Sequence, residues 1–60
     1  MIEYAIKLRK QGDKRFDFVS DKGATHLRIH ARRYDTHAKA IAAIDHSGPH
    51  PGYDIKVVSL

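Results

Sequence analysis

The sequence predicts a small α+β domain, a mainly antiparallel sheet with one helix packed on one face. Apolar and polar residues alternate in four segments, which is the pattern of strands that bury one face. Between the third and fourth segments, residues 36–44 are rich in alanine and repeat apolar residues at steps of three and four, as a helix does. We therefore expect one domain over residues 1–60, with the element order β-β-β-α-β.

The first two strands are expected over residues 2–9 and 15–20. In the first, alternation assigns one set of side chains to the core: Ile2, Tyr4, Ile6 and Leu8. The other set would face solvent: Glu3, Ala5, Lys7 and Arg9. In the second strand, Phe16 and Phe18 share one phase, which we also assign to the core. The polar residues 10–14 between the strands have the composition of a hairpin loop.

The third expected strand, residues 24–32, has the most informative pattern in the chain. Leu27, Ile29 and Ala31 alternate with residues that are cationic or can become so near neutral pH. On a strand these would form one apolar face and one cationic ladder, with a spacing of about 6.6 Å along the ladder. The ladder would consist of His26, Arg28, His30 and Arg32.

The helix and the last strand complete the predicted fold. Asp35 is a suitable N-cap for the helix, because its carboxylate can accept from N–H groups of the first turn. Gly48 is a plausible C-cap, and the prolines that follow it cannot continue a helix. Residues 53–60 are expected to form the fourth strand. The helix is long enough to serve as a crossover, so both a parallel and an antiparallel neighbour remain open for this strand.

Composition narrows the class of protein. Eleven Lys and Arg against seven Asp and Glu give a formal net charge of +4, which favours anionic partners as well as solubility. The chain has no cysteine, which rules out disulfides and thiolate zinc sites and is typical of a reducing compartment. There is no apolar run of about 18 residues and no signal-peptide pattern. We expect a cytoplasmic (intracellular) protein with no membrane contact.

The expected solvent face of the sheet is the candidate binding site. Seven cationic or titratable side chains would share it: Lys7, Arg9, Arg15, His26, Arg28, His30 and Arg32. Arginine suits phosphate because its planar fork pairs two oxygens at once. With the phenylalanines assigned to the core, no aromatic stacking platform is expected, so contact with a duplex or its backbone is favoured. The competing interpretation is a face whose charges only keep the protein in solution.

Catalysis and metal binding are not expected. His26 and His30 would lie about 13 Å apart on a strand, too far to chelate one ion. His30 and its arginine neighbours could in principle cleave a phosphodiester, but residues two apart on a strand lie side by side and do not converge on a pocket. We predict no enzyme activity, no metal and no cofactor.

A second candidate surface is apolar. Three aliphatic side chains fall out of phase with the expected core and would form an exposed seam for a homodimer or another partner: Val19, Val58 and Leu60. The favoured function is a noncatalytic binding module that contacts nucleic-acid phosphates through the basic sheet face. The alternative is a small protein-binding inhibitor or adaptor, of the phage or mobile-element accessory type, that docks on an acidic protein surface.

Overall fold

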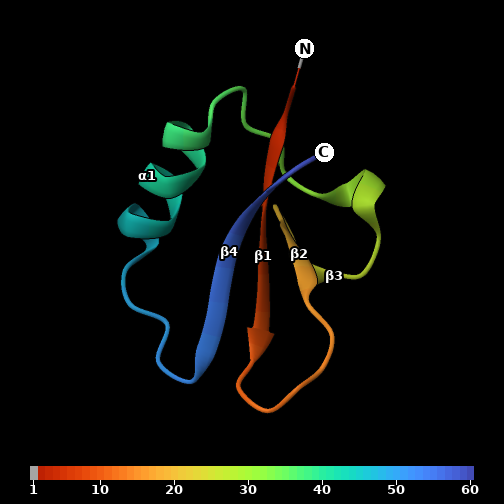
Figure 1. The fold of residues 1–60 in the computed structure, drawn as a ribbon, viewed down its shortest axis with the longest axis vertical. Coiled ribbons are helices and arrows are strands. Elements are labelled where there is room, and N and C mark those ends of the chain that lie inside the picture. The colour runs from red at the N-terminus through yellow and green to blue at the C-terminus, as the bar shows by residue number, and fades with distance from the viewer. Residues whose placement is uncertain (1) are drawn as a thin grey trace.

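A computed structural model describes residues 2–60 and confirms the α+β fold (Figure 1). The elements are β1 (Tyr4–Lys10), β2 (Asp17–Ser20), β3 (Gly23–Thr25), a 3₁₀ helix η1 (Arg28–His30), α1 (His37–Ser47) and β4 (Tyr53–Ser59). The sheet order is β3-β2-β1-β4, and each neighbouring pair is antiparallel. The question left open for the fourth strand is thereby answered: β4 runs antiparallel to β1.

β1 and β4 form the longest strand pair of the sheet. Its register runs without interruption from Tyr4 opposite Ser59 to Lys10 opposite Tyr53. The pairing continues past β4, where the Leu60 N–H donates to the Glu3 carbonyl at 2.8 Å. The start of β1 and the end of β4 therefore lie at the same end of the sheet, as Figure 1 shows.

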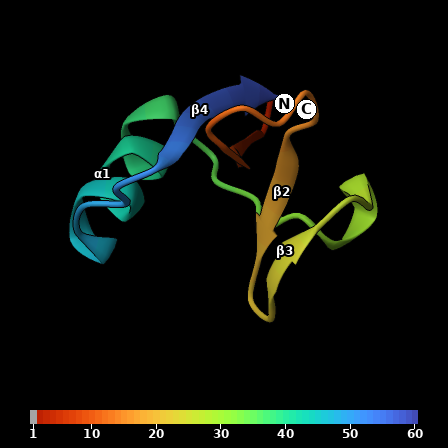
Figure 2. The ribbon, with the colours of Figure 1, turned by 90° about the horizontal axis from the view of Figure 1, so that it is seen from below.

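β2 and β3 diverge from this pair. β2 is registered with β1 only at Lys7–Phe18 and Leu8–Asp17. Toward the start of β1, Tyr34 replaces β2 as the neighbour of this strand and exchanges two hydrogen bonds of 2.8 Å with Tyr4. In Figure 2, β2 and β3 turn away from β4, while the segment leading into α1 crosses behind β2. The sheet is consequently bent, and only part of it lies under the helix.

The prediction of a third strand over residues 24–32 is wrong beyond Thr25. β3 ends there, and residues 28–30 form η1 in place of a continued strand. The reason is local, because the Thr25 hydroxyl oxygen accepts from the Leu27 N–H at 3.2 Å and so offers the backbone an alternative to the sheet. The His30 and Ala31 N–H groups donate to the Leu27 and Arg28 carbonyls, which closes the turn of η1, and Ile29 is 76% exposed. The cationic ladder therefore does not exist as a row along a strand.

The core lies between α1 and the sheet. Ile6 and Ala40 are buried there. Ala5, which was expected to face solvent, is instead fully buried on the opposite side of the sheet, across from Val58, and Ala31 is buried directly after η1. A cavity of about 260 Å³ opens beside Ile6, lined by Leu8 and Ile55 from the sheet and Ile44 from the helix among others. These contacts confirm the core phase expected for Ile6 and Leu8. Ile2, assigned to the same phase, precedes β1 and is 64% exposed.

The N-terminus of α1 is capped one residue later than expected. The Thr36 hydroxyl oxygen, not the Asp35 carboxylate, accepts from the Lys39 N–H at 3.1 Å. Asp35 instead pairs with the Lys39 ammonium, with an Nζ–Oδ1 distance of 2.9 Å. The hydrogen bond from the Lys39 side chain holds the pKa of Asp35 below its ordinary value of 3.8. Thr36 thus caps the backbone of α1, while Asp35 forms an ion pair across the first turn.

Replacing Thr36 with alanine is expected to lower the free energy of unfolding by about 1 kcal/mol, because the Lys39 N–H loses its acceptor. The measurement is urea denaturation followed by circular dichroism. Thr36→Ser should keep the cap and most of the stability. Asp35→Ala is the control for the ion pair and should cost less than Thr36→Ala. An equal or larger cost for Asp35→Ala would contradict the assignment of the cap.

Candidate functional site

The strand register assigns the phenylalanines to the side of the sheet opposite the helix. Phe18 lies directly across from Lys7, and Lys7 lies directly across from Lys56 on β4, so these three residues share one face. Ile6 and Leu8, the neighbours of Lys7 in sequence, line the cavity under α1. The core assignment of Phe18, and of Phe16 in the same phase, is therefore wrong.

Cationic side chains cover these two phenyl rings. The Lys7 ammonium lies 4.7 Å from the centre of the Phe18 ring. Phe16 is contacted by the Arg9 guanidinium at 4.6 Å and by the Lys56 ammonium at 4.2 Å. Both rings are half-buried, although they lie on the side of the sheet opposite α1. The apolar stems and cationic heads of long side chains thus replace a conventional core contact. We call Lys7, Arg9, Lys56, Phe16 and Phe18 the cation–phenylalanine face.

The charges on this face are unevenly compensated. Arg9 donates through Nε to the Asp54 carboxylate at 2.9 Å. Lys7 and Lys56 face each other across neighbouring strands, and within residues 2–60 neither forms an ion pair with a carboxylate. Like charges in directly opposed positions of a sheet repel each other. The centre of the cation–phenylalanine face is therefore a place where an anion would be stabilised.

The site residues predicted from the sequence do not include Lys56. Its phase on the last strand, opposite to Ile55 and Val57, indicated that it faces away from the core. Its position beside Lys7 depends on the register between β1 and β4, strands separated by more than forty residues. Only the pairing could reveal that contact, because alternation says nothing about register.

The structure does not assemble the seven predicted residues into one patch. Lys7 and Arg9 lie on the cation–phenylalanine face, whereas Arg15 is exposed in the segment that precedes β2. Three others are exposed in and around η1: His26, Arg28 and His30. In both views of the ribbon the strands separate η1 from α1 (Figures 1 and 2). These three residues therefore lie away from the helix but do not form a row.

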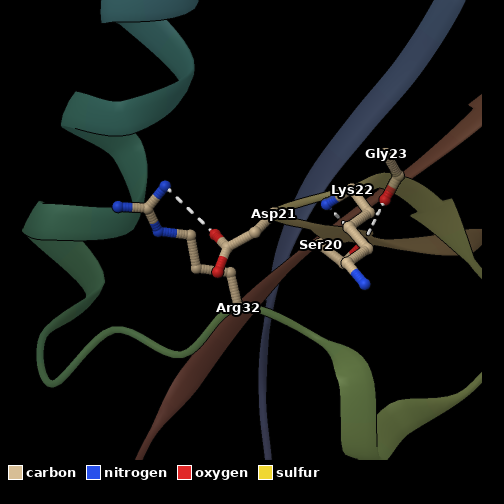
Figure 3. Close-up of polar contacts among 5 residues, drawn as sticks. All are labelled: Ser20, Asp21, Lys22, Gly23 and Arg32. Carbon is tan, nitrogen blue, oxygen red and sulfur yellow. Dashed lines mark hydrogen bonds and ion pairs between the residues drawn. The ribbon is translucent and has the colours of Figure 1, made fainter.

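Arg32 has a separate environment. Its guanidinium pairs with the Asp21 carboxylate at 3.4 Å and lies 5.8 Å from the centre of the Tyr34 ring. Figure 3 shows this ion pair reaching across to the turn between β2 and β3. In that turn the Ser20 hydroxyl donates to the Gly23 carbonyl at 2.6 Å and accepts from the Lys22 N–H. Arg32 thus contacts the β2–β3 turn, and Asp21 offsets its charge.

The expected apolar seam is also divided. Val19 lines the cavity under α1 and belongs to the helix side of the sheet. Val58 lies opposite Ala5 on the other side and is half-buried, as is Leu60. β4 is an edge strand, which is the property that motivated the seam. The homodimer or partner contact through Val58 and Leu60 stays a prediction.

The other polar clusters supply no competing centre. Ser47 Oγ and His50 Nε2 lie 2.9 Å apart just past the end of α1, where Ser47 also donates to the Ile44 carbonyl. Among residues 2–60, no group of three or more His, Asp or Glu side chains is arranged to hold a metal ion. No helix in that range has the length and apolar character needed to cross a bilayer.

Comparison of the chain with models of known protein families found no match, and neither did comparison with curated proteins or with solved structures. The cation–phenylalanine face is the strongest candidate, because it combines uncompensated charge and aromatic surface on the side of the sheet that α1 leaves uncovered.

Proposed function

We propose that this protein is a noncatalytic binding module that contacts the phosphates of a nucleic acid through the cation–phenylalanine face. The observation that carries the proposal is the direct opposition of Lys7 and Lys56 on the face that the helix leaves uncovered. Two like-charged side chains at opposed positions of neighbouring strands cost free energy in the isolated protein. A phosphate placed between them would convert that repulsion into attraction, which favours an anionic partner.

Neighbouring residues support this proposal. Asp54 holds the Arg9 guanidinium in a fixed place on the same face, whereas the lysines keep flexible heads that can follow a backbone. The net charge of +4 would attract a polyanion over a longer range. His26, Arg28 and His30 are exposed and would add contacts to a longer ligand. The intracellular location that such a partner requires is part of the proposal.

Salt dependence is the first test. Fluorescence anisotropy with a labelled 20-base-pair DNA duplex should show an affinity that falls steeply as salt rises from 50 to 200 mM. Two or three phosphate contacts, from the lysines and Arg9, correspond to a slope of about −1.8 to −2.7 in a plot of log K against log salt.

Absence of binding at 50 mM salt, for the duplex and for a single strand of the same length, would contradict the proposal. If an acidic protein surface were the partner instead, the protein would fail this test. It would then retain a stoichiometric protein partner from nuclease-treated extract of its host.

A further inference from the structure

We infer that the nucleic acid is single-stranded and that its bases stack on the rings of Phe16 and Phe18. This inference rests on the proposed function and specifies its substrate class. Contact with phosphates alone would need only the cations. The phenyl rings on the same face are the additional observation, because proteins bind single strands by pairing a cationic surface with aromatic side chains on which bases stack.

The position of the rings suits this role. Phe16 and Phe18 are two residues apart, so an extended chain separates them by roughly 6.6 Å on the same face. That separation is about twice the 3.4 Å rise per nucleotide along one strand of B-form DNA. A single strand whose bases are splayed apart could place one base on each ring. The bases of an intact duplex are stacked on one another and could not reach the rings without being unstacked.

The groups that cover the rings can move. Lys7 and Lys56 approach the rings through their ammonium groups, at the ends of flexible four-carbon stems. A cation over a half-buried surface ring is held less strongly than a stacked base. An arriving base would therefore take the place of the ammonium group, which would move to the adjacent phosphate. The lysines would serve as covers of the rings in the isolated protein and as phosphate contacts in the complex.

Arg9 differs from the two lysines. Its guanidinium is hydrogen-bonded to Asp54 and lies over the Phe16 ring, with Cζ 4.6 Å from the ring centre. A planar guanidinium can itself support a base, so a base could stack on Arg9 above the Phe16 ring, and Arg9 would not need to leave the ring. The structure thus provides two rings and one fixed guanidinium plane on a single face.

Three probes of equal length separate stacking from phosphate contact. They are a 12-nucleotide DNA single strand, the same strand with abasic sites at its eight central positions, and the 12-base-pair duplex. At 50 mM salt the intact single strand should bind at least tenfold more tightly than the abasic strand, since each stacked base contributes roughly that factor. It should also bind more tightly than the duplex. Upfield shifts of the phenylalanine ring protons in NMR spectra should accompany binding of the intact strand only.

A matched pair of variants tests the residues. Phe16→Leu combined with Phe18→Leu should remove the preference for the intact strand, by weakening binding of the intact strand much more than binding of the abasic strand. Tyr53→Leu removes an aromatic ring that is 47% exposed and belongs to the first residue of β4. This control variant should keep the preference for the intact strand. Should the double leucine variant not fold, the comparison of the three probes on the unaltered protein still decides the question.

The outcomes distinguish this inference from the proposed function. Equal affinity for the intact and abasic strands, or tighter binding of the duplex, would overturn stacking and leave phosphate binding in place. No binding of any of the three probes would overturn both. A preference for the intact strand that the double leucine variant retains would show that other residues hold the bases, and would overturn the assignment to Phe16 and Phe18.

Discussion

Replacing Ile6 with alanine is expected to leave the protein largely unfolded at room temperature. Ile6 is 5% exposed, and the other fully buried side chains among residues 2–60 are alanines. Removing a buried isoleucine side chain costs about 2–5 kcal/mol, through lost transfer free energy and the cavity left behind. A single core in a chain of this size supplies little more than about 3–5 kcal/mol of stability. The cost of one substitution is therefore comparable with the whole free energy of unfolding.

Circular dichroism during urea denaturation measures this effect. Ile29→Ala is the matched control, because the same side chain is removed from a position that is 76% exposed in η1. That control should change the free energy of unfolding by no more than about 0.5 kcal/mol. Ile6→Val should give an intermediate loss of about 0.5–1.5 kcal/mol. Equal denaturation midpoints for Ile6→Ala and Ile29→Ala would refute the central position of Ile6 in the core.

Replacing Lys7 and Lys56 together with glutamine should weaken binding to duplex DNA about 60-fold at 0.1 M salt. The figure follows from losing two phosphate contacts, each of which contributes about 0.9 to the slope of log K against log salt. The slope itself should become shallower by about 1.8. The relief of repulsion between the opposed lysines should offset the loss of their contacts with Phe18 and Phe16, so the thermal unfolding temperature should stay nearly unchanged.

The control for this variant changes charge elsewhere. Lys39→Glu lowers the net charge by the same two units, but Lys39 lies on α1 and pairs with Asp35. If only overall charge attracted the nucleic acid, Lys39→Glu and the double glutamine variant would weaken binding equally. The proposed site predicts a much smaller effect for Lys39→Glu. Anisotropy titrations of both variants at three salt concentrations decide between these two results.

Several elements could be predicted because their signals are local. Alternation over residues 2–9 and 53–60 correctly indicated the two long strands, and the alanine-rich segment indicated α1. The start of the helix was misplaced by one residue, because Asp35 and Thr36 are both good N-caps. Lys39 resolves the choice by giving its N–H to Thr36 and its ammonium group to Asp35.

The pattern in residues 24–32 failed for a physical reason. Leu27, Ile29 and Ala31 have the alternation of a strand, but the side chain of Thr25 bonds to the backbone and the chain turns into η1. β2 is only four residues long and offers no partner for a longer third strand. A strand needs a neighbour to satisfy its backbone, and alternation alone does not supply one.

By itself, the sequence determined the fold class, the helix, the two long strands and the positive charge, because periodicity and composition are properties of neighbouring residues. Only the tertiary structure decided which face of the sheet received Phe16 and Phe18, and that Lys56 lies beside Lys7. Alternation shows that two residues share a face but not which face it is. Pairing between distant strands sets that choice, and a shift of one residue would reverse it.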